Sequence, residues 1–369
     1  MPEAIDIDNN SALLKLVADN PDTMQLPFLN GAVIDQDNNT LLHCAAGGGH
    51  TNTVKLLLAK GAPIAATNKN NDTPLQLAIK NGHTAVVELL LPTGASVEAL
   101  RAEYNTLLHV AAQEGQTEVV KLLLEKGGSV QAAATTNYIS PLHLAAENGH
   151  TGVVELLLEK GARVEAMAPT DNSSPLHLAA ENGHTDVVEL LLKRTPSIDA
   201  SVDYRYNTSL HIAARGGRTG VAKLLVENGA SIELKNEPGN NPLHLAAYQG
   251  HTDLVELLLE KGASVEVKNK YGSTPLHIAA MMGHTGVVKL LLAHGASIEE
   301  KNAYGSTPLR LAENPDIVEL LENEDTKRNN QVKPGVQSER KEQRCLSLGP
   351  LVVVFFICLF LSKQYLANK

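Results

Sequence analysis

The chain has 369 residues with 31 Lys or Arg and 41 Asp or Glu, so its formal net charge at pH 7 is −10. Residues 323–369 carry eight Lys/Arg and four Asp/Glu, a net of +4, which leaves −14 on residues 1–322. An acidic body of this kind repels nucleic-acid phosphates, so we expect no nucleic-acid partner. Only three cysteines occur, too few for a disulfide framework.

The N-terminal segment precedes the regular part of the chain. Residues 1–10 are acidic and lack an apolar run, so they do not resemble a signal peptide. Residues 11–32 place Leu and Val on one helical face, but Pro21 and Pro27 interrupt the pattern. A stack of repeats needs a cap over its first apolar face, and we assign residues 1–36 to an N-terminal capping repeat.

A nineteen-residue segment is repeated almost unchanged in the middle of the chain. Ser140–Leu158 returns as Ser174–Leu192 with one difference, Gly152 against Asp186. The same unit occurs nine times at intervals of 33 or 34 residues, with its Ser/Thr/Asn position at Thr40, Thr73, Thr106, Ser140, Ser174, Thr208, Asn241, Thr274 and Thr307.

Each unit predicts two short helices with their own start and stop signals. Ser140 suits a helix N-cap, and Pro141 suits the first helical position because it has no N–H to leave unpaired. Gly149 favours the left-handed turn that ends the first helix, and Gly161 does the same for the second. One such unit cannot bury its own apolar face, so neighbouring units must stack.

The period and the Thr-Pro-Leu-His-x-Ala pattern resemble the ankyrin repeat. The clearest examples are Thr274-Pro275-Leu276-His277-Ile278-Ala279 and Thr73-Pro74-Leu75-Gln76-Leu77-Ala78. The resemblance covers residues 37–322. It implies an all-α solenoid of nine helix-turn-helix units with β-hairpin fingers between them, and a role in binding other proteins.

Two joints depart from the repeat pattern. Pro92 falls at the end of the second helix of repeat two, so that helix should stop early. In repeat five Thr195-Pro196 replaces the expected Gly-Ala, which removes the residue best able to take positive φ. We expect the stack to be bent or softened between repeats five and six.

The C-terminal part of the sequence changes character twice. Residues 323–344 are polar and basic and predict a flexible linker. Residues 345–362 carry no charge and, about 27 Å long as a helix, predict a single transmembrane helix within residues 345–369. Its apolar core is Leu351, Val352, Val353, Val354, Phe355, Phe356, Ile357, Leu359, Phe360 and Leu361.

The charges flanking this segment predict its orientation. Lys333, Arg340, Lys341 and Arg344 precede it, which favours a tail-anchored, single-pass protein with its repeats on the cytoplasmic side. The alternative is an apolar helix that folds back on the last repeat, and Gly349-Pro350 favours this reading by shortening the helix.

The fourteen histidines invite a metal or catalytic interpretation, but the repeat accounts for thirteen of them. One set occupies the Thr-Pro-Leu-His position and another follows the helix-ending glycine, so the rings are spaced one repeat apart rather than converging on a metal. The ankyrin resemblance implies that the first set hydrogen-bonds locally. With no phosphate-binding loop and no nucleophile beside a base, we expect no metal, no cofactor, no small-molecule substrate and no enzymatic activity.

The aromatic and Met residues are the candidate partner-binding residues. Six Tyr lie in the loops that precede the first helices, and the ends of the first helices of repeats seven and eight carry one further Tyr and a Met pair. The predicted partner-binding residues are Tyr104, Tyr138, Tyr204, Tyr206, Tyr248, Tyr271, Met281, Met282 and Tyr304. The alternative is that each Tyr packs on its neighbouring finger.

Three of these tyrosines stand at an unusual place in the repeat. Tyr104, Tyr138 and Tyr206 occupy the turn position that is Gly239 or Gly272 elsewhere, where positive φ is favoured. We expect their fingers to adopt another shape. Glu114, Glu147 and Glu181 in repeats three to five form an acidic row at the ends of the first helices, and we expect Tyr104 and Tyr138 to flank it.

These observations predict a non-catalytic interaction scaffold that holds a protein partner at a membrane surface. Near-identical repeats followed by a terminal apolar segment are similar to ankyrin proteins of intracellular bacteria, and that resemblance implies a host-directed effector. The alternative function is a regulatory or substrate-recruiting subunit for a separate enzyme.

Overall fold

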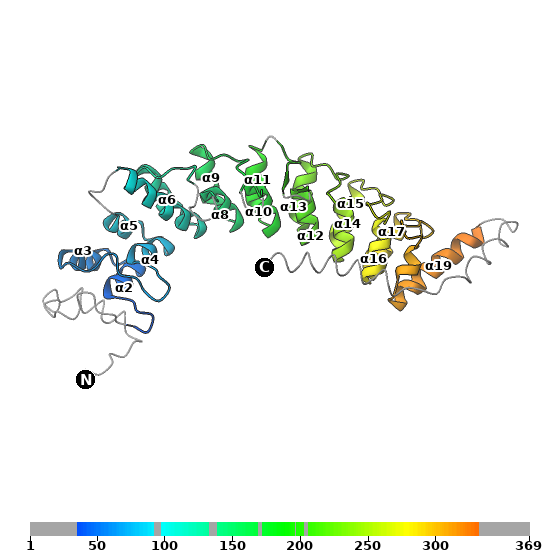
Figure 1. Cartoon of the computed structure of the whole chain (residues 1–369), viewed down its shortest axis with the longest axis horizontal. Coiled ribbons are helices and arrows are strands. Elements are labelled where there is room, and N and C mark those ends of the chain that lie inside the picture. The colour runs from blue at the N-terminus through cyan, green and yellow to red at the C-terminus, as the bar shows by residue number, and fades with distance from the viewer. Residues whose placement is uncertain are drawn as a thin grey trace. The chain divides into compact units, whose positions relative to one another are not determined.

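The computed structural model describes residues 35–91, 97–132, 139–168, 172–195, 197–202 and 206–331. Within these ranges the chain forms eighteen α-helices and one pair of two-residue strands. The helices make nine consecutive pairs that follow the nine repeats (Figure 1). The prediction of nine helix-turn-helix units is therefore confirmed.

The bounds of the helices show a short first helix and a slightly longer second helix in most repeats. The first helices are α2 (Leu41–Gly47), α4 (Pro74–Lys80), α6 (Val97–Gln113), α8 (Pro141–Glu147), α10 (Pro175–Asn182), α12 (Ser209–Gly216), α14 (Pro242–Gln249), α16 (Pro275–Met282) and α18 (Pro308–Leu311). The second helices are α3 (Thr51–Ala59), α5 (Thr84–Leu90), α7 (Thr117–Glu125), α9 (Thr151–Glu159), α11 (Thr185–Leu192), α13 (Thr219–Glu227), α15 (Thr252–Glu260), α17 (Thr285–Ala293) and α19 (Pro315–Gln331).

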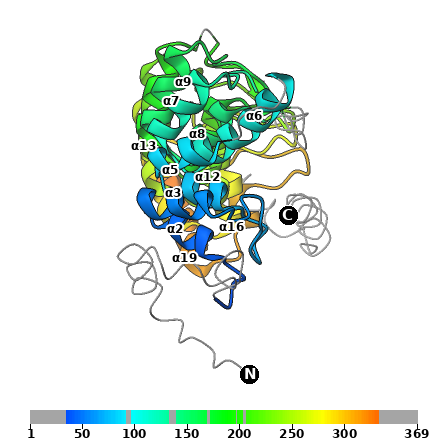
Figure 2. The ribbon, with the colours of Figure 1, turned by 90° about the vertical axis from the view of Figure 1, so that its left-hand side faces the viewer.

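The repeats form two compact units that divide between Ala230 and Ser231. In unit 1 the first helices α2 to α12 pack in sequence order as one layer, and the second helices α3 to α13 pack as another. Figure 2 shows α3, α5, α7 and α9 following one another in this second layer. Unit 2 repeats the arrangement, with α14, α16 and α18 in one layer and α15, α17 and α19 in the other.

The core lies between the two layers of each unit. In repeat four, Leu142 and Ala146 of α8 and Val154 and Leu157 of α9 are at most 1% exposed. The alanines allow neighbouring helices to approach closely, while each buried Leu stabilises the fold by about 2 kcal/mol. Because each repeat buries its apolar face against its neighbours, the stability of each unit depends on the interfaces between its repeats.

The predicted N-caps of the first helices are present in every repeat except the third. Ser140 is extended and places its Oγ 2.7 Å from Nδ1 of His143, which also accepts the Ser140 N–H at 3.2 Å. Gln76 serves the same purpose in repeat two, where its Oε1 accepts the Thr73 N–H at 2.8 Å. Gly149 takes a φ of 76° after α8, as expected of a left-handed helix end.

The first set of histidines makes the predicted local bond and also a bond between repeats that we did not predict. The Nε2 atoms of His43, His109, His143, His244 and His277 lie 3.1, 2.9, 3.2, 3.0 and 3.0 Å from the carbonyl oxygens of Asp72, Ile139, Ser173, Ser273 and Ser306. Each of these oxygens belongs to the following repeat. The rings of His43, His143, His244 and His277 therefore fix their own helix starts and attach them to the next repeat, whereas His109 lies inside α6 with its Nδ1 2.6 Å from the Asn105 carbonyl oxygen.

The second set of histidines points the opposite way along the stack. The Nε2 atoms of His83, His150, His184 and His284 lie 2.9, 2.7, 2.8 and 3.0 Å from the carbonyl oxygens of Gly47, Gln113, Glu147 and Tyr248 in the preceding repeat. Gln116 and Arg218 make the equivalent bonds with their own nitrogens, at 2.8 and 2.9 Å. The histidine pattern is thus explained by hydrogen bonds between repeats.

The loops before the first helices differ from the expected β-hairpin fingers. The described strands are β1 (Ser201–Val202) and β2 (Asn207–Thr208), which pair antiparallel with Ser201 opposite Thr208. The loop before α16 is instead a tight turn, in which the Asn269 N–H donates to the Ser273 carbonyl at 3.0 Å. The Asn269 side chain accepts the N–H groups of Tyr271 and Ser273. The turn therefore satisfies these backbone groups without a longer pair of strands.

Repeat three departs most from the prediction. Its first helix starts at Val97, so Tyr104 and Thr106 lie within α6 rather than in a finger and at a helix cap. Residues 97–104 contain neither Gly nor Pro and are rich in strong helix formers, which lets the helix run through the place of the turn. Tyr104 is 7% exposed, so the prediction that it lies on a partner-binding finger is wrong.

The two irregular joints behave differently. α5 ends at Leu90, two residues before Pro92, and Leu91 is extended with ψ of 137°, so the predicted early stop is confirmed. At Thr195-Pro196, side chains replace the missing glycine cap: Arg194 Nη1 donates to the Leu158 carbonyl and Thr195 Oγ1 to the Leu191 carbonyl, each at 2.8 Å. The expected softness of this joint stays a prediction.

The C-terminal boundary of the repeats also moves. α19 continues to Gln331, so the first nine residues of the segment expected to be a flexible linker, residues 323–331, are helical. Polar residues after Leu321 extend the helix because Glu, Lys and Gln are good helix formers. Residues 1–34, the rest of the linker and the predicted membrane segment 345–369 lie outside the described residues. No described helix combines the length and apolarity needed to cross a bilayer.

Candidate protein-interaction surface

Five of the predicted partner-binding residues fall together in unit 2. We call Tyr248, Tyr271, Met281, Met282 and Tyr304 the Tyr/Met surface. Tyr248 ends α14, the two methionines end α16, and the tyrosines Tyr271 and Tyr304 lie in the turns before α16 and α18. Because α14, α16 and α18 pack in one layer, consecutive repeats supply the members of this surface.

Asparagine side chains hold the two turn tyrosines in place. Asn269 Oδ1 accepts the N–H groups of Tyr271 and Ser273 at 3.0 and 3.1 Å. Asn302 Oδ1 accepts the N–H of Tyr304 at 3.0 Å in the same way. The backbone under each tyrosine is therefore fixed, while its side chain is exposed, 41% for Tyr271 and 51% for Tyr304.

The two tyrosine turns are also bonded directly to each other. The Ala303 N–H donates to the carbonyl oxygen of Tyr271 at 2.9 Å. Gly272 has a φ of 68°, and a Cβ there would lie 2.8 Å from the Ala303 nitrogen. Glycine at this position thus meets both a conformational and a steric need, and it allows adjacent turns to form one rigid edge.

The helix-end part of the Tyr/Met surface has its own link. His284 Nε2 lies 3.0 Å from the carbonyl oxygen of Tyr248, which fixes the end of α14 against the start of α17. Met282 is 37% exposed, whereas Met281 and Tyr248 are half-buried. The eight residues of α16 place this end about 10 Å along the helix from the turn that carries Tyr271.

Charged side chains near the turns are mutually paired. Lys270 Nζ lies 2.7 Å from Glu237 Oε1, and Lys268 Nζ lies 2.6 Å from Glu300 Oε2. The hydrogen bond from Lys268 lowers the pKa of the Glu300 carboxyl. Burial lowers the pKa of His277, the ring beneath this edge, so it is held in its neutral form. The tyrosines thus stand among paired charges.

The remaining predicted tyrosines are not part of this surface. Tyr206 lies in unit 1 and is 61% exposed. Its φ is 56°, so a tyrosine occupies the left-handed position directly, while its finger carries the β1/β2 pair in place of the tight turn before α16. Tyr104 is buried in α6, and Tyr138 and Tyr204 lie outside the described residues.

This turn position has a positive φ in several repeats where the residue is not glycine, which the sequence analysis did not predict. Asn38, Asn71 and Asn172 hold it in other repeats, with φ between 56° and 60°. Asparagine tolerates this conformation better than other residues with side chains, so its recurrence was the available signal that the turn is conserved in shape.

The acidic row of unit 1 is exposed as expected. Glu114, Glu147 and Glu181 end or follow consecutive first helices, and Glu181 Oε1 lies 3.3 Å from Arg215 Nη2. Because Tyr104 is buried, it does not flank this row. The row is a solvated edge with one ion pair, which contributes little to stability.

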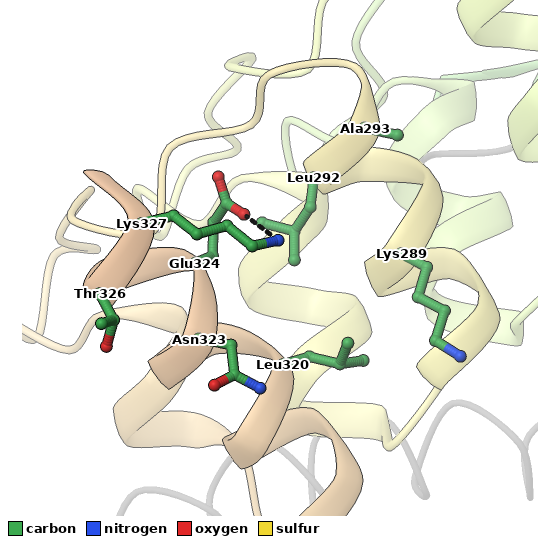
Figure 3. A pocket seen from close by; sticks show the side chains of 8 residues that line it. All are labelled: Lys289, Leu292, Ala293, Leu320, Asn323, Glu324, Thr326 and Lys327. Carbon is green, nitrogen blue, oxygen red and sulfur yellow. Dashed lines mark ion pairs between the residues drawn. The ribbon is translucent and has the colours of Figure 1, made fainter. Parts of the chain in front are cut away.

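A cavity of about 520 Å³ opens between α17 and α19 in unit 2 (Figure 3). Leu292, Ala293 and Leu320 supply its apolar side chains, and Glu324 and Lys327 pair at 3.7 Å on its rim. This lining contains no nucleophile beside a base. Among the described residues, no group of three His, Cys, Asp or Glu side chains could hold a metal ion.

Paired helices stacked in two layers, joined by turns that expose selected side chains, define a helical repeat protein built for contact with other proteins. A family model for ankyrin repeats, described as three copies, matches residues 8–101, 97–168, 165–236 and 243–331. The chain therefore belongs to the ankyrin-repeat family, whose members are generally non-catalytic protein–protein interaction scaffolds. The first match starts at residue 8, within the segment assigned to the N-terminal cap.

The comparison with solved structures agrees with this family. The chain is similar to the ankyrin repeat domain of Bcl-3, which is described as a unique member of the IkappaB protein family. The two share 29% identity with a TM-score of 0.52, over 58% of this chain and 97% of that chain. No curated protein sequence matches the chain.

Proposed function

We propose that this protein holds a protein partner at a membrane surface and that the Tyr/Met surface makes the contact. The clustering of exposed Tyr271, Met282 and Tyr304 on consecutive repeats of one unit is the observation that carries the proposal. Tyr buries a large area at low entropy cost, and Met adapts to the shape of what it touches.

The rigidity of the turns supports this role. Tyr271 and Tyr304 stand on backbone that is already fixed by Asn269, Asn302 and the bond between Ala303 and Tyr271. Binding would then order few groups beyond the side chains themselves, and this lowers the entropy cost of association. Half-buried Tyr248 and Met281 extend the apolar area at the helix ends.

The membrane part of the proposal is supported by sequence. Leu351–Leu361 is an uninterrupted apolar run, and the basic residues before it favour a cytoplasmic location for the repeats. Anchoring would confine the bound partner to the membrane surface and raise its local concentration there. The protein itself would supply contact and position, with no chemical step.

The partner is best sought by proximity labelling in the native cell, followed by pull-down with the purified chain. The triple variant Tyr271→Ala, Met282→Ala, Tyr304→Ala removes exposed side chains only, so it should abolish capture without lowering thermal stability. The double variant Asn148→Ala, Asn182→Ala changes the positions equivalent to Met282 in repeats four and five, and it should leave capture intact. Unchanged capture by the triple variant would reject this surface.

The membrane location has a separate test. Carbonate extraction of native membranes should leave the full-length chain in the pellet and release a chain truncated before Cys345. Release of the full-length chain into the supernatant would overturn the anchor, whatever the outcome of the pull-down.

A further inference from the structure

We propose that the apolar segment Leu351–Leu361 binds the Tyr/Met surface of its own chain when it is not in a membrane. Membrane insertion of the segment would then uncover the surface for the partner. This inference rests on the proposed function only for the role of the Tyr/Met surface in binding a partner. The contact between the segment and the surface is tested without any partner.

The chemistry of the two elements is complementary. The segment has eleven consecutive residues without a charge, including Phe355, Phe356 and Phe360. In water this run is unfavourable, because its apolar area stays hydrated until something covers it. The Tyr/Met surface exposes aromatic rings and a thioether that pack well against phenylalanine.

The connection between them is short enough to favour the contact. The described chain ends in α19 at Gln331, within unit 2, and nineteen residues separate Gln331 from Leu351. Nineteen residues reach up to about 65 Å, several times the length of α16. A tether of this length gives an effective concentration on the order of millimolar, so even a weak contact would be populated.

Charge favours the same contact. Residues 231–331 of unit 2 carry nine Lys/Arg and fourteen Asp/Glu, a net of −5. Residues 332–369 carry six Lys/Arg and two Asp/Glu, a net of +4. The basic flanks of the apolar segment are thus attracted to the unit that bears the Tyr/Met surface, and this attraction weakens as salt is raised.

The consequence is a two-state switch. The bilayer and the Tyr/Met surface compete for one segment, and the partner and the segment compete for one surface. A membrane therefore raises the apparent affinity for the partner by removing the internal competitor, by the factor by which the uncovered fraction of the surface rises.

The experiment uses the natural thiol of Cys358, which lies inside the apolar segment. In the full-length chain with Cys345→Ser, the substitution Met282→Cys places a second thiol on the Tyr/Met surface, and mild oxidation reports their contact. The matched control is Asn148→Cys, the equivalent position of repeat four in unit 1. Cys44 contributes little background because burial raises the pKa of its thiol to about 11.

We expect the disulfide between positions 282 and 358 to form in at least about fivefold higher yield than that between 148 and 358. Mixing isotope-labelled and unlabelled chains should show by mass spectrometry that the bond is within one chain. Adding phosphatidylcholine vesicles with a minority of phosphatidylserine, or substituting Phe355→Ser and Phe356→Ser, should reduce the yield several-fold.

Three results would overturn the proposal: equal yields at positions 282 and 148, a bond formed between chains, or a yield that vesicles do not change. A folded circular-dichroism spectrum establishes that each variant is intact. These outcomes are independent of the proposed function, which fails only if the partner still binds the Tyr271, Met282, Tyr304 variant or if the chain leaves the membrane in carbonate.

Discussion

The Nε2 atom of His277 lies 3.0 Å from the carbonyl oxygen of Ser306 and joins repeat eight to repeat nine. Nδ1 of the same ring accepts the Thr274 N–H at 3.2 Å. A neutral imidazole with its proton on Nε2 satisfies both contacts, and we assign that tautomer from the hydrogen-bond network. One side chain thus closes a helix cap and an interface between repeats.

Replacing His277 by Ala should destabilise unit 2 by about 2–4 kcal/mol. The Thr274 N–H would be left buried without its partner, and the Ser306 carbonyl would keep only the Asn302 N–H, which it accepts at 3.0 Å. His277→Gln should lose about half as much, because Gln76 shows that glutamine can close the cap. Urea unfolding followed by circular dichroism measures both variants. Equal losses would mean that the cap contributes nothing.

Stability should fall as pH drops below about 6.5. Burial lowers the pKa of His43 and His277 from the ordinary value of 6.5. At a pH between 6.5 and the lower pKa of the folded state, these histidines are protonated in the unfolded chain and neutral in the folded chain. Lowering the pH through this range therefore favours unfolding. Urea unfolding near pH 7.5 and near pH 5.5 should show this loss. The His277→Gln variant should show a smaller difference between the two conditions, and an equal difference would refute the role of this ring.

Tyr206→Gly should stabilise unit 1 by about 1–2 kcal/mol, because glycine takes a φ of 56° without the steric cost that tyrosine bears. The reverse change at the edge of the Tyr/Met surface, Gly272→Ala, should destabilise unit 2, since the new Cβ meets the Ala303 nitrogen at 2.8 Å. Thermal unfolding of the two variants checks the pair. A drop in stability for Tyr206→Gly would show that the tyrosine side chain makes a compensating contact.

Ser209→Pro should raise stability by about 1 kcal/mol. Ser209 is fully buried at the first position of α12, and its Oγ has no hydrogen-bond partner among the described residues. Proline holds this position in α8, α10, α14 and α16, and Thr208 before it is already extended with ψ of 170°. Pro275→Ser in α16 is the matched opposite and should destabilise. Chemical denaturation in which both changes act in the same direction would disprove this account.

The sequence by itself determined the repeats and most of the helix limits. A period of 33 or 34 residues, Ser/Thr/Asn caps and helix-ending glycines are local signals, and local signals act through the backbone of the residues that carry them. Pro92 shows this well, since the end of α5 at Leu90 follows from the proline ring alone. Tyr271, Met282 and Tyr304 were also found from sequence, because their positions in the repeat implied exposure.

Only the tertiary structure decided which side chains bond to the neighbouring repeat and which are buried by it. The bond from His277 to Ser306 spans twenty-nine residues in sequence, so no local pattern contains it. The sequence placed Tyr104 in a finger, but α6 continues through that turn and Tyr104 is buried; Tyr206 takes the left-handed φ that glycine or asparagine takes at this position in other repeats. In a stacked protein, burial and hydrogen bonding of a side chain depend on the adjoining repeat, and that dependence is absent from the sequence of any one repeat.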